Sequence, residues 1–245
     1  MNQIGIRAKA PLSKPFFVFA QKFRKNVGIS FNRTLIGCMN NLSGTRLHCI
    51  RSNRVVFEDL SFYLESSEML YLTGPNGSGK SSLLRILAGF LRPSAGELSW
   101  DGASEPNHEK IQYIGHQNAV KGALSVLENL SFWSQINGDW GDQKTLACAL
   151  QTFGLEKLAN LPARFLSAGQ ARRLTLARLL VVRAPLWILD EPATSLDTAN
   201  EVALQSAIQA HLEEGGMVVM ATHAGMKADA KVLDMSAFGK TAATG

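Results

Sequence analysis

From residue 47 onward, the pattern of apolar and polar residues predicts short strands that alternate with helices. Continuous apolar, β-prone runs such as 70–73 and 186–189 are typical of strands buried on both faces of a sheet. The predicted strands are 47–50, 54–57, 61–63, 70–73, 97–100, 111–115, 186–189, 217–221 and 231–235. The predicted helices follow Lys80 and Ser125, and cover 142–153, 167–183 and 198–214. This alternation predicts an α/β fold, with a largely parallel sheet covered by helices.

Between strand 70–73 and the next helix lies the sequence Gly-Pro-Asn-Gly-Ser-Gly-Lys-Ser. It has the G-x-x-x-x-G-K-[ST] spacing of a phosphate-binding loop, in the strand–loop–helix context that this motif requires. Glycine backbone N–H groups can surround an anion, Lys80 adds a charge for the β- and γ-phosphates, and Ser81 is placed to bind Mg²⁺. A glycine-rich turn that only reverses the chain is the alternative, and the full spacing argues against it. The predicted nucleotide contacts are Gly74, Pro75, Asn76, Gly77, Ser78, Gly79, Lys80, Ser81 and Ser82.

Strand 186–189 ends in two acidic residues, Asp190 and Glu191. A charge at the carboxyl end of a buried parallel strand needs a partner. Asp190 is suited to hold Mg²⁺, and Glu191 to polarise an attacking water. A strand end capped by solvated acids is the alternative.

Further segments carry a resemblance to a known family. Leu166-Ser-Ala-Gly-Gln170, followed by a basic helix, resembles the signature motif of ABC-type ATPases, with alanine where glycine is commonest. Gln117 matches the Q-loop glutamine, Ser195-Leu-Asp197 matches the D-loop, and His223 matches the switch histidine. The resemblance implies a P-loop α/β fold with a small antiparallel β portion and a compact helical subdomain at about 118–183.

In that family, two domains pack head to tail and each ATP lies between one phosphate loop and the signature of the other domain. The resemblance therefore implies a homodimer, with ATP and Mg²⁺ as ligands. It assigns Glu191 as general base and His223 to the γ-phosphate and water. Gln117 would sense Mg²⁺ together with Ser81 and Asp190. The remaining implied ATP contacts are Ser167, Gly169, Gln170 and Asp197.

Residues 113–133 and 165–174 are similar to the ATP-binding subunits of haem exporters in cytochrome c maturation. That resemblance implies a peripheral protein on the cytoplasmic face of the inner membrane, with CcmB-like and CcmC-like membrane partners. The chain has no Cys-Pro pair and no C-x-x-C-H motif, so we expect no direct haem binding; we also expect no nucleic-acid partner. The alternatives are an ABC ATPase for another cargo and, less favoured, a soluble non-transport ABC protein.

One position departs from the family pattern. The aromatic residue on which most family members stack the adenine is missing, and its place falls near Arg51, whose guanidinium can also stack on a base.

The helix opened by the Ser125–Glu128 capping box carries adjacent aromatic residues, Phe132 and Trp133. They point about 100° apart on a helix, so we expect one to be more exposed and to contact the membrane subunit.

The net charge of +5 is unevenly distributed: ten basic residues and no acidic residue precede Val55, which leaves 15 basic and 20 acidic residues in the rest. Residues 1–45 lack periodicity, and we expect a basic extension outside a domain at 46–245. Dispensable upstream sequence with Met39 as the start, a targeting segment and a functional arm remain alternatives. Cys38, Cys49 and Cys148 have neither disulfide nor zinc-site spacing.

Overall fold

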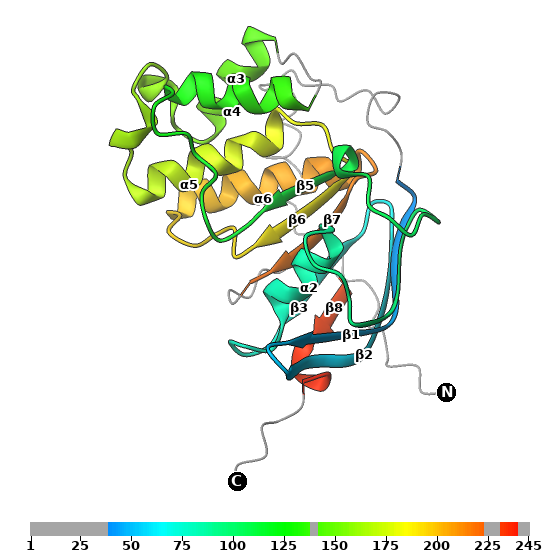
Figure 1. Ribbon diagram of the computed structural model, residues 1–245. Helices are drawn as coiled ribbons and strands as arrows, with labels where there is room; N and C mark the ends of the chain where they lie inside the picture. Colours follow the sequence, from blue (N-terminus) through cyan, green and yellow to red (C-terminus); the bar gives the residue numbers. More distant parts are fainter. Residues whose placement is uncertain (1–38, 138–141, 223–230, 240–245) are drawn as a thin grey trace.

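The computed structural model describes residues 39–137, 142–222 and 231–239 (Figure 1). Predictions for residues 1–38 and for His223 lie outside these ranges. Within them, a parallel sheet has five strands in the order β5-β6-β7-β3-β8. These strands are β3 (Met69–Thr73), β5 (Ile111–Ile114), β6 (Leu186–Asp190), β7 (Met217–Ala221) and β8 (Lys231–Asp234). The predicted parallel sheet is confirmed.

The described helices form two groups: two pack on strands of the parallel sheet, and three pack against one another beside it (Figure 1). They are α2 (Lys80–Leu87), α3 (Val126–Ile136), α4 (Gln143–Thr152), α5 (Ala168–Ala177) and α6 (Thr198–Glu213). Single 3-10 turns are η1 (His108–Lys110), η2 (Glu156–Leu158), η3 (Ala163–Phe165), η4 (Arg178–Leu180) and η5 (Met235–Ala237). None of the helices in the described ranges has the length and apolar character needed to cross a bilayer.

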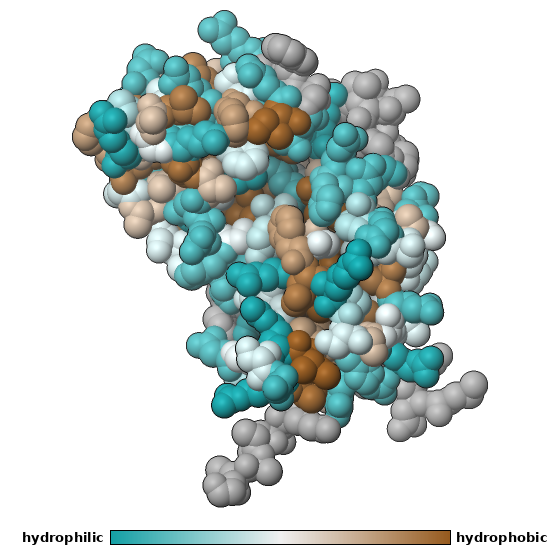
Figure 2. All heavy atoms as spheres, in the orientation of Figure 1, coloured by the Kyte–Doolittle hydropathy of each residue, from teal (hydrophilic) through white to brown (hydrophobic). Residues whose placement is uncertain are grey.

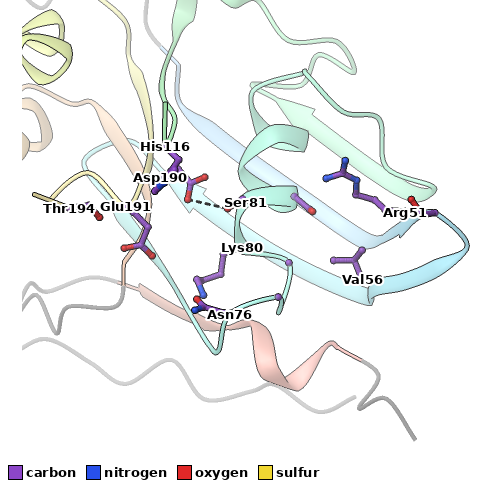
Figure 3. Close-up of a pocket in the computed structure, with 13 residues that line it drawn as sticks. Arg51, Val56, Asn76, Lys80, Ser81, His116, Asp190, Glu191 and Thr194 are labelled. Atoms are coloured by element: carbon purple, nitrogen blue, oxygen red, sulfur yellow. Dashed lines mark hydrogen bonds between the residues drawn. The ribbon is translucent and has the colours of Figure 1, made fainter. Parts of the chain in front are cut away.

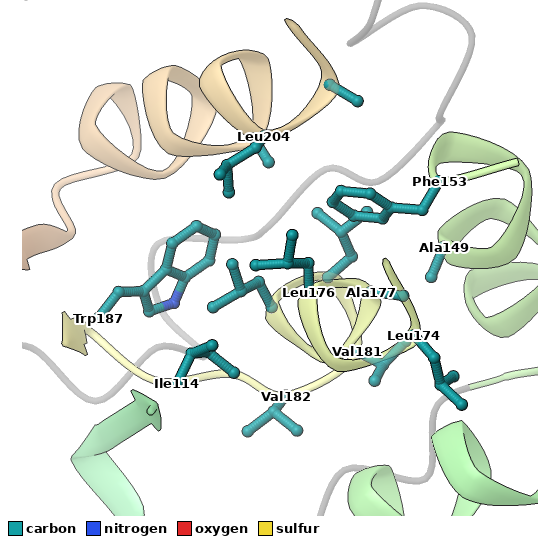
Figure 4. Packing of buried hydrophobic residues seen from close by; sticks show 14 of the residues in the cluster. Ile114, Ala149, Phe153, Leu174, Leu176, Ala177, Val181, Val182, Trp187 and Leu204 are labelled. Atoms are coloured by element: carbon teal, nitrogen blue, oxygen red, sulfur yellow. The ribbon is translucent and has the colours of Figure 1, made fainter. Parts of the chain in front are cut away.

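Alternate residues of the parallel strands pack into two separate hydrophobic clusters. Along β7, Val218 and Met220 contribute to the cluster that includes α3, α4, α5 and α6, which Figure 4 shows in part. Val219 and Ala221 contribute to the other cluster, with α2 and the antiparallel sheet. Because side chains alternate across a strand, this division explains why these strands are apolar throughout.

The antiparallel sheet has the order β2-β1-β4 and packs beside α2. Its strands are β1 (Asn41–Arg51), β2 (Arg54–Glu65) and β4 (Ala95–Trp100). The prediction of a first strand at 47–50 was too short, because β1 begins at Asn41 and pairs with β2 and β4 on its two sides. Met39 is also buried, so residues 41–45 belong to the fold rather than to the N-terminal extension.

Two helix predictions have different outcomes. The capping box at Ser125 and Glu128 is confirmed and opens α3. The helix predicted over 167–183 ends instead at Ala177, where the chain tightens into η4. Val181 and Val182 follow, and β-branched residues just ahead of a proline at Pro185 favour ending a helix.

The structure predicts where an N-terminal truncation becomes harmful. A chain that begins at Met39 keeps all of β1, and its free energy of unfolding should match that of the full chain. A chain that begins at Leu47 loses the buried side chains of Met39 and Leu42 and half of a central strand, and should be less stable by about 4 kcal/mol or more. Urea denaturation of the three proteins measures both effects. Equal stability of the two truncated chains would contradict the role given to residues 41–46.

Candidate functional site

The phosphate loop joins β3 to α2, as predicted, and its glycines are required by its geometry. Gly77 and Gly79 have φ values of 82° and 98°, a region that favours glycine. At Gly79 a Cβ atom would also lie 2.8 Å from Val56 Cγ1. The loop can therefore approach the antiparallel sheet closely and begin α2 at Lys80, with the helix N-terminus at the loop.

Lys80 is only 7% exposed, and its ammonium group is held by its own loop. Its Nζ donates to the carbonyl oxygens of Gly74 at 2.7 Å and Pro75 at 3.0 Å. A buried ammonium is costly unless its protons are bonded, so these oxygens compensate the charge. When a nucleotide binds, phosphate oxygens in the adjoining pocket can replace these carbonyl oxygens as acceptors and compensate the same charge.

The acid pair at the end of β6 lies beside this loop. Asp190 is 5% exposed, and its Oδ1 accepts a hydrogen bond of 3.2 Å from Ser81 Oγ (Figure 3). A hydroxyl and a carboxylate are the oxygen ligands that Mg²⁺ prefers, with phosphate and water oxygens completing the set. The described residues contain no group of three or more His, Cys, Asp or Glu that could hold a metal ion. One hydroxyl and one carboxylate supply only part of the octahedral oxygen shell of Mg²⁺, so this donor set fits Mg²⁺ bound jointly with a nucleotide.

Glu191 occupies an unusual backbone conformation directly after β6. Its φ is 48°, which is uncommon for a residue with a side chain, and its N–H donates to Ala221 O at 3.0 Å. Such strain is concentrated at functional sites, where the surrounding structure maintains it. The turn directs Glu191 into the same pocket as Lys80 and Asp190 (Figure 3).

These groups line a pocket of about 670 Å³. Arg51 and Val56 lie at one end, and Glu191 and Thr194 lie at the other (Figure 3). The pocket therefore extends to the position where the sequence places the base contact. Its lining residues are Arg51, Ser52, Val56, Asn76, Gly77, Gly79, Lys80, Ser81, Ser82, His116, Asp190, Glu191 and Thr194.

Several predicted site residues do not line this pocket. Gln117 is exposed, and its neighbour His116 takes the lining position at the end of β5. In the phosphate loop, Gly74, Pro75 and Ser78 shape the backbone without lining the cavity. The signature residues and Asp197 are likewise absent from the lining.

The signature segment instead forms the start of α5. Ser167 and Gln170 form a reciprocal capping box, in which each side chain accepts from the backbone N–H of the other. At Gly169 a Cβ atom would lie 3.2 Å from Ser195 O, so the glycine allows close contact with the segment before α6. Asp197 caps α6, and hydrogen bonds from Asn200 hold the pKa of its carboxyl below the usual range.

Sequence reasoning missed the part played by Arg172, on α5. It is 4% exposed, and its guanidinium donates to Gly115 O at 2.8 Å and Glu191 O at 2.7 Å. It also donates to Asp190 O at 3.1 Å and Pro192 O at 3.2 Å. Burial lowers the pKa of Arg172, and the nearby charges of Asp190 and Glu191 oppose that shift. Arg172 lies four residues before the buried Leu176 and therefore on the same face of the helix. That spacing was the signal in the sequence that Arg172 is buried.

A protein-family model matches just over half of the chain. The family model described as "ABC transporter" matches residues 57–194. This interval contains the phosphate loop, the signature segment and the acid pair.

Curated relatives match over most of their length. The "Cytochrome c biogenesis ATP-binding export protein CcmA" of Paramagnetospirillum magneticum is 47% identical over 192 residues, which cover 76% of this chain and 88% of that protein. The protein of the same name from Bradyrhizobium diazoefficiens is 47% identical over 194 residues, 78% of this chain and 96% of that protein.

Solved structures confirm the predicted fold class. A putative ABC transporter ATP-binding protein from Pyrococcus furiosus has a TM-score of 0.72 at 24% identity, over 81% of this chain and 99% of that chain. A dimeric ATP-binding cassette in a post-hydrolysis state, bound to ADP and Pi, has a TM-score of 0.66 at 24% identity, over 75% of this chain and 88% of that chain. These likenesses show the ABC-ATPase fold.

Proposed function

Because this chain belongs to the ABC transporter family, and within it to the CcmA proteins, we propose that it is the ATP-hydrolysing subunit of an export complex required for c-type cytochrome biogenesis. One observation carries the proposal of ATP hydrolysis. The phosphate loop after β3 and the acid pair after β6 line one pocket, where Ser81 Oγ donates to Asp190 Oδ1. That pocket combines anion binding with one carboxylate suited to Mg²⁺ and one suited to the attacking water, a combination that fits phosphoryl transfer to water.

In the proposed binding mode, the loop N–H groups and the N-terminus of α2 hold the phosphates. Lys80 turns its ammonium from the carbonyl oxygens of Gly74 and Pro75 toward the β- and γ-phosphates. Arg51 and Val56 receive the base at the other end of the pocket. A guanidinium can stack on a purine but gives little discrimination between purines.

For the chemical step, Ser81 and Asp190 would hold Mg²⁺, which would neutralise charge on the phosphates. Glu191 accepts a proton from the attacking water, and its position after β6 suits that role. Gln117 and His223 keep the roles that the family resemblance implies, at the metal and at the γ-phosphate.

Completion of the site requires a second copy. The signature residues Ser167, Gly169 and Gln170, together with Asp197, do not line the pocket of their own chain. We propose that they close the pocket of a partner copy, with the N-terminus of α5 directed at its γ-phosphate. ATP then forms part of the dimer interface, and hydrolysis weakens that interface.

The names of the relatives support export in cytochrome c biogenesis, and we propose haem delivery as the process served. Membrane subunits, CcmB-like and CcmC-like, would supply the spanning segments. The ATPase would bind them peripherally at the cytoplasmic face of the inner membrane, without binding haem itself.

The proposed partner surface includes Phe132 on α3. Trp133 packs against the core, and Arg178 lies 3.6 Å from the centre of its ring. Phe132 is also partly exposed and is covered on one side by Lys121, 4.4 Å from its ring centre. Figure 2 shows hydrophobic residues exposed among hydrophilic ones over this helical region. Phe132 is therefore the aromatic residue of the pair that is available to a partner.

Two substitutions separate ATP binding from ATP turnover. Lys80→Ala removes the phosphate charge partner and should weaken ATP binding and hydrolysis together. Glu191→Gln keeps size and hydrogen bonding but removes the base, so kcat should fall about 100-fold or more while ATP binding persists. Binding of labelled ATP and phosphate release measure the two quantities. Normal phosphate release by Glu191→Gln would refute the role given to this carboxylate.

Phe132→Ala tests the partner surface. Loss of an interface aromatic should weaken association with the membrane subunit by about 30-fold, the equivalent of a hot spot of about 2 kcal/mol. ATPase activity of the isolated protein should hardly change. The control is Tyr63→Ala, which removes an exposed aromatic side chain on β2, in the antiparallel sheet. Affinity is measured by titrating each variant against the detergent-solubilised membrane subunit, and equal affinities would exclude Phe132 from the interface.

A further inference from the structure

One buried guanidinium joins three segments that the ATPase site requires. Arg172 lies five residues after Ser167, on the helix that the signature opens. Its hydrogen bonds reach Gly115, which directly follows β5, and the consecutive residues Asp190, Glu191 and Pro192. All four acceptors are backbone carbonyl oxygens, so Arg172 fixes the course of the chain rather than any side chain.

The bonded turn is the one that places Glu191. A φ of 48° at Glu191 is unfavourable for a residue with a side chain, so the turn persists only where its surroundings hold it. Three successive carbonyl groups of this turn point to one side chain. Arginine presents five N–H donors in a rigid planar fork, whereas lysine presents three donors around a single nitrogen. No other residue type could satisfy these acceptors together.

We propose that Arg172 is a positioning residue for ATP hydrolysis, which holds the Glu191 turn and the segment after β5 in register with the signature helix. The inference rests on the proposed role of Glu191 as general base. It adds that the direction of this carboxylate is set from α5. In the proposed dimer, α5 of one copy contacts the ATP bound by the other copy. Arg172 thereby links α5 to Glu191, which acts on the ATP bound by its own copy.

Loss of Arg172 should change the position of the Glu191 carboxylate, and with it the rate of hydrolysis, more than the affinity for nucleotide. Displacement of a catalytic group by about 1 Å costs on the order of 100-fold in rate. The hydrogen bonds of Arg172 go to the segment after β5 and to the turn after β6, and not to the phosphate loop, so nucleotide affinity should be preserved. A residue needed only for stability would change the unfolding transition without separating kcat from KM.

Arg172→Lys is the test, with Arg173→Lys as its matched control. Arg173 is the next residue on α5, and it donates to the carbonyl oxygens of Phe153 and Gly154, after α4. In Arg172→Lys, kcat should fall about 10- to 100-fold while KM and equilibrium ATP binding stay within about threefold. The control should keep kcat within about threefold. Unchanged kcat, or a loss that lies mainly in KM, would overturn the proposal.

Stability is measured on the same samples by thermal unfolding. Should Arg172→Lys not fold, Arg172→Gln keeps part of the stem and two amide donors, and is measured in the same way. Unfolding of both, while Arg173→Lys stays folded, would assign Arg172 to stability alone and overturn the proposal.

A double substitution tests whether Arg172 acts through Glu191. In a Glu191→Gln background, Arg172→Lys should lower the single-turnover rate far less than it does in the unaltered protein. An equal fold-loss of the single-turnover rate in both backgrounds would show that Arg172 does not act through Glu191, and would overturn the proposal. Normal turnover by Glu191→Gln alone would instead refute the proposed function of that residue. An inactive Glu191→Gln with a normal Arg172→Lys would refute only the inference about Arg172.

Discussion

Parallel pairing is the constraint on which the site depends. When strands run parallel, their carboxyl ends lie at one edge of the sheet, so loops that are distant in sequence meet there. β3 delivers the phosphate loop to this edge, and β6 delivers Asp190 and Glu191, with β7 between them. Ser81 and Asp190 are 109 residues apart in the chain, yet their side chains are joined by a hydrogen bond.

The second constraint is that buried charges need partners. Three ionised side chains near the pocket are almost inaccessible to water, and each is compensated differently. Lys80 uses loop carbonyl oxygens, Asp190 accepts from a hydroxyl, and Arg172 bonds four backbone carbonyl oxygens. Two of these arrangements can be exchanged for contacts with a nucleotide and its metal ion. The hydrogen bonds of Arg172 go to backbone carbonyl oxygens of the protein, which suits a structural link between segments.

Much of this arrangement could be predicted from the sequence, because the signals are local. The spacing around Lys80, the acids that end β6 and the capping box at Ser125 are patterns of neighbouring residues, and each determines the backbone of its own segment. The early start of β1 could not be predicted from the sequence, because residues 41–45 show no apolar pattern of their own. They are held in the sheet by pairing with β2 and β4. Arg172 was missed for a related reason: its acceptors are backbone groups far away in sequence. The predicted roles of Gln117 and of the signature remain predictions.

If two copies share each site, mixing two inactive variants should restore ATP hydrolysis. Lys80→Ala has a defective phosphate loop and an intact signature, whereas Ser167→Arg has the reverse. A head-to-tail mixed dimer contains one site in which both parts are intact. We expect an equimolar mixture to hydrolyse ATP well above the rate of either variant alone. If the mixture is as inactive as its components, the signature does not complete the pocket of a second copy.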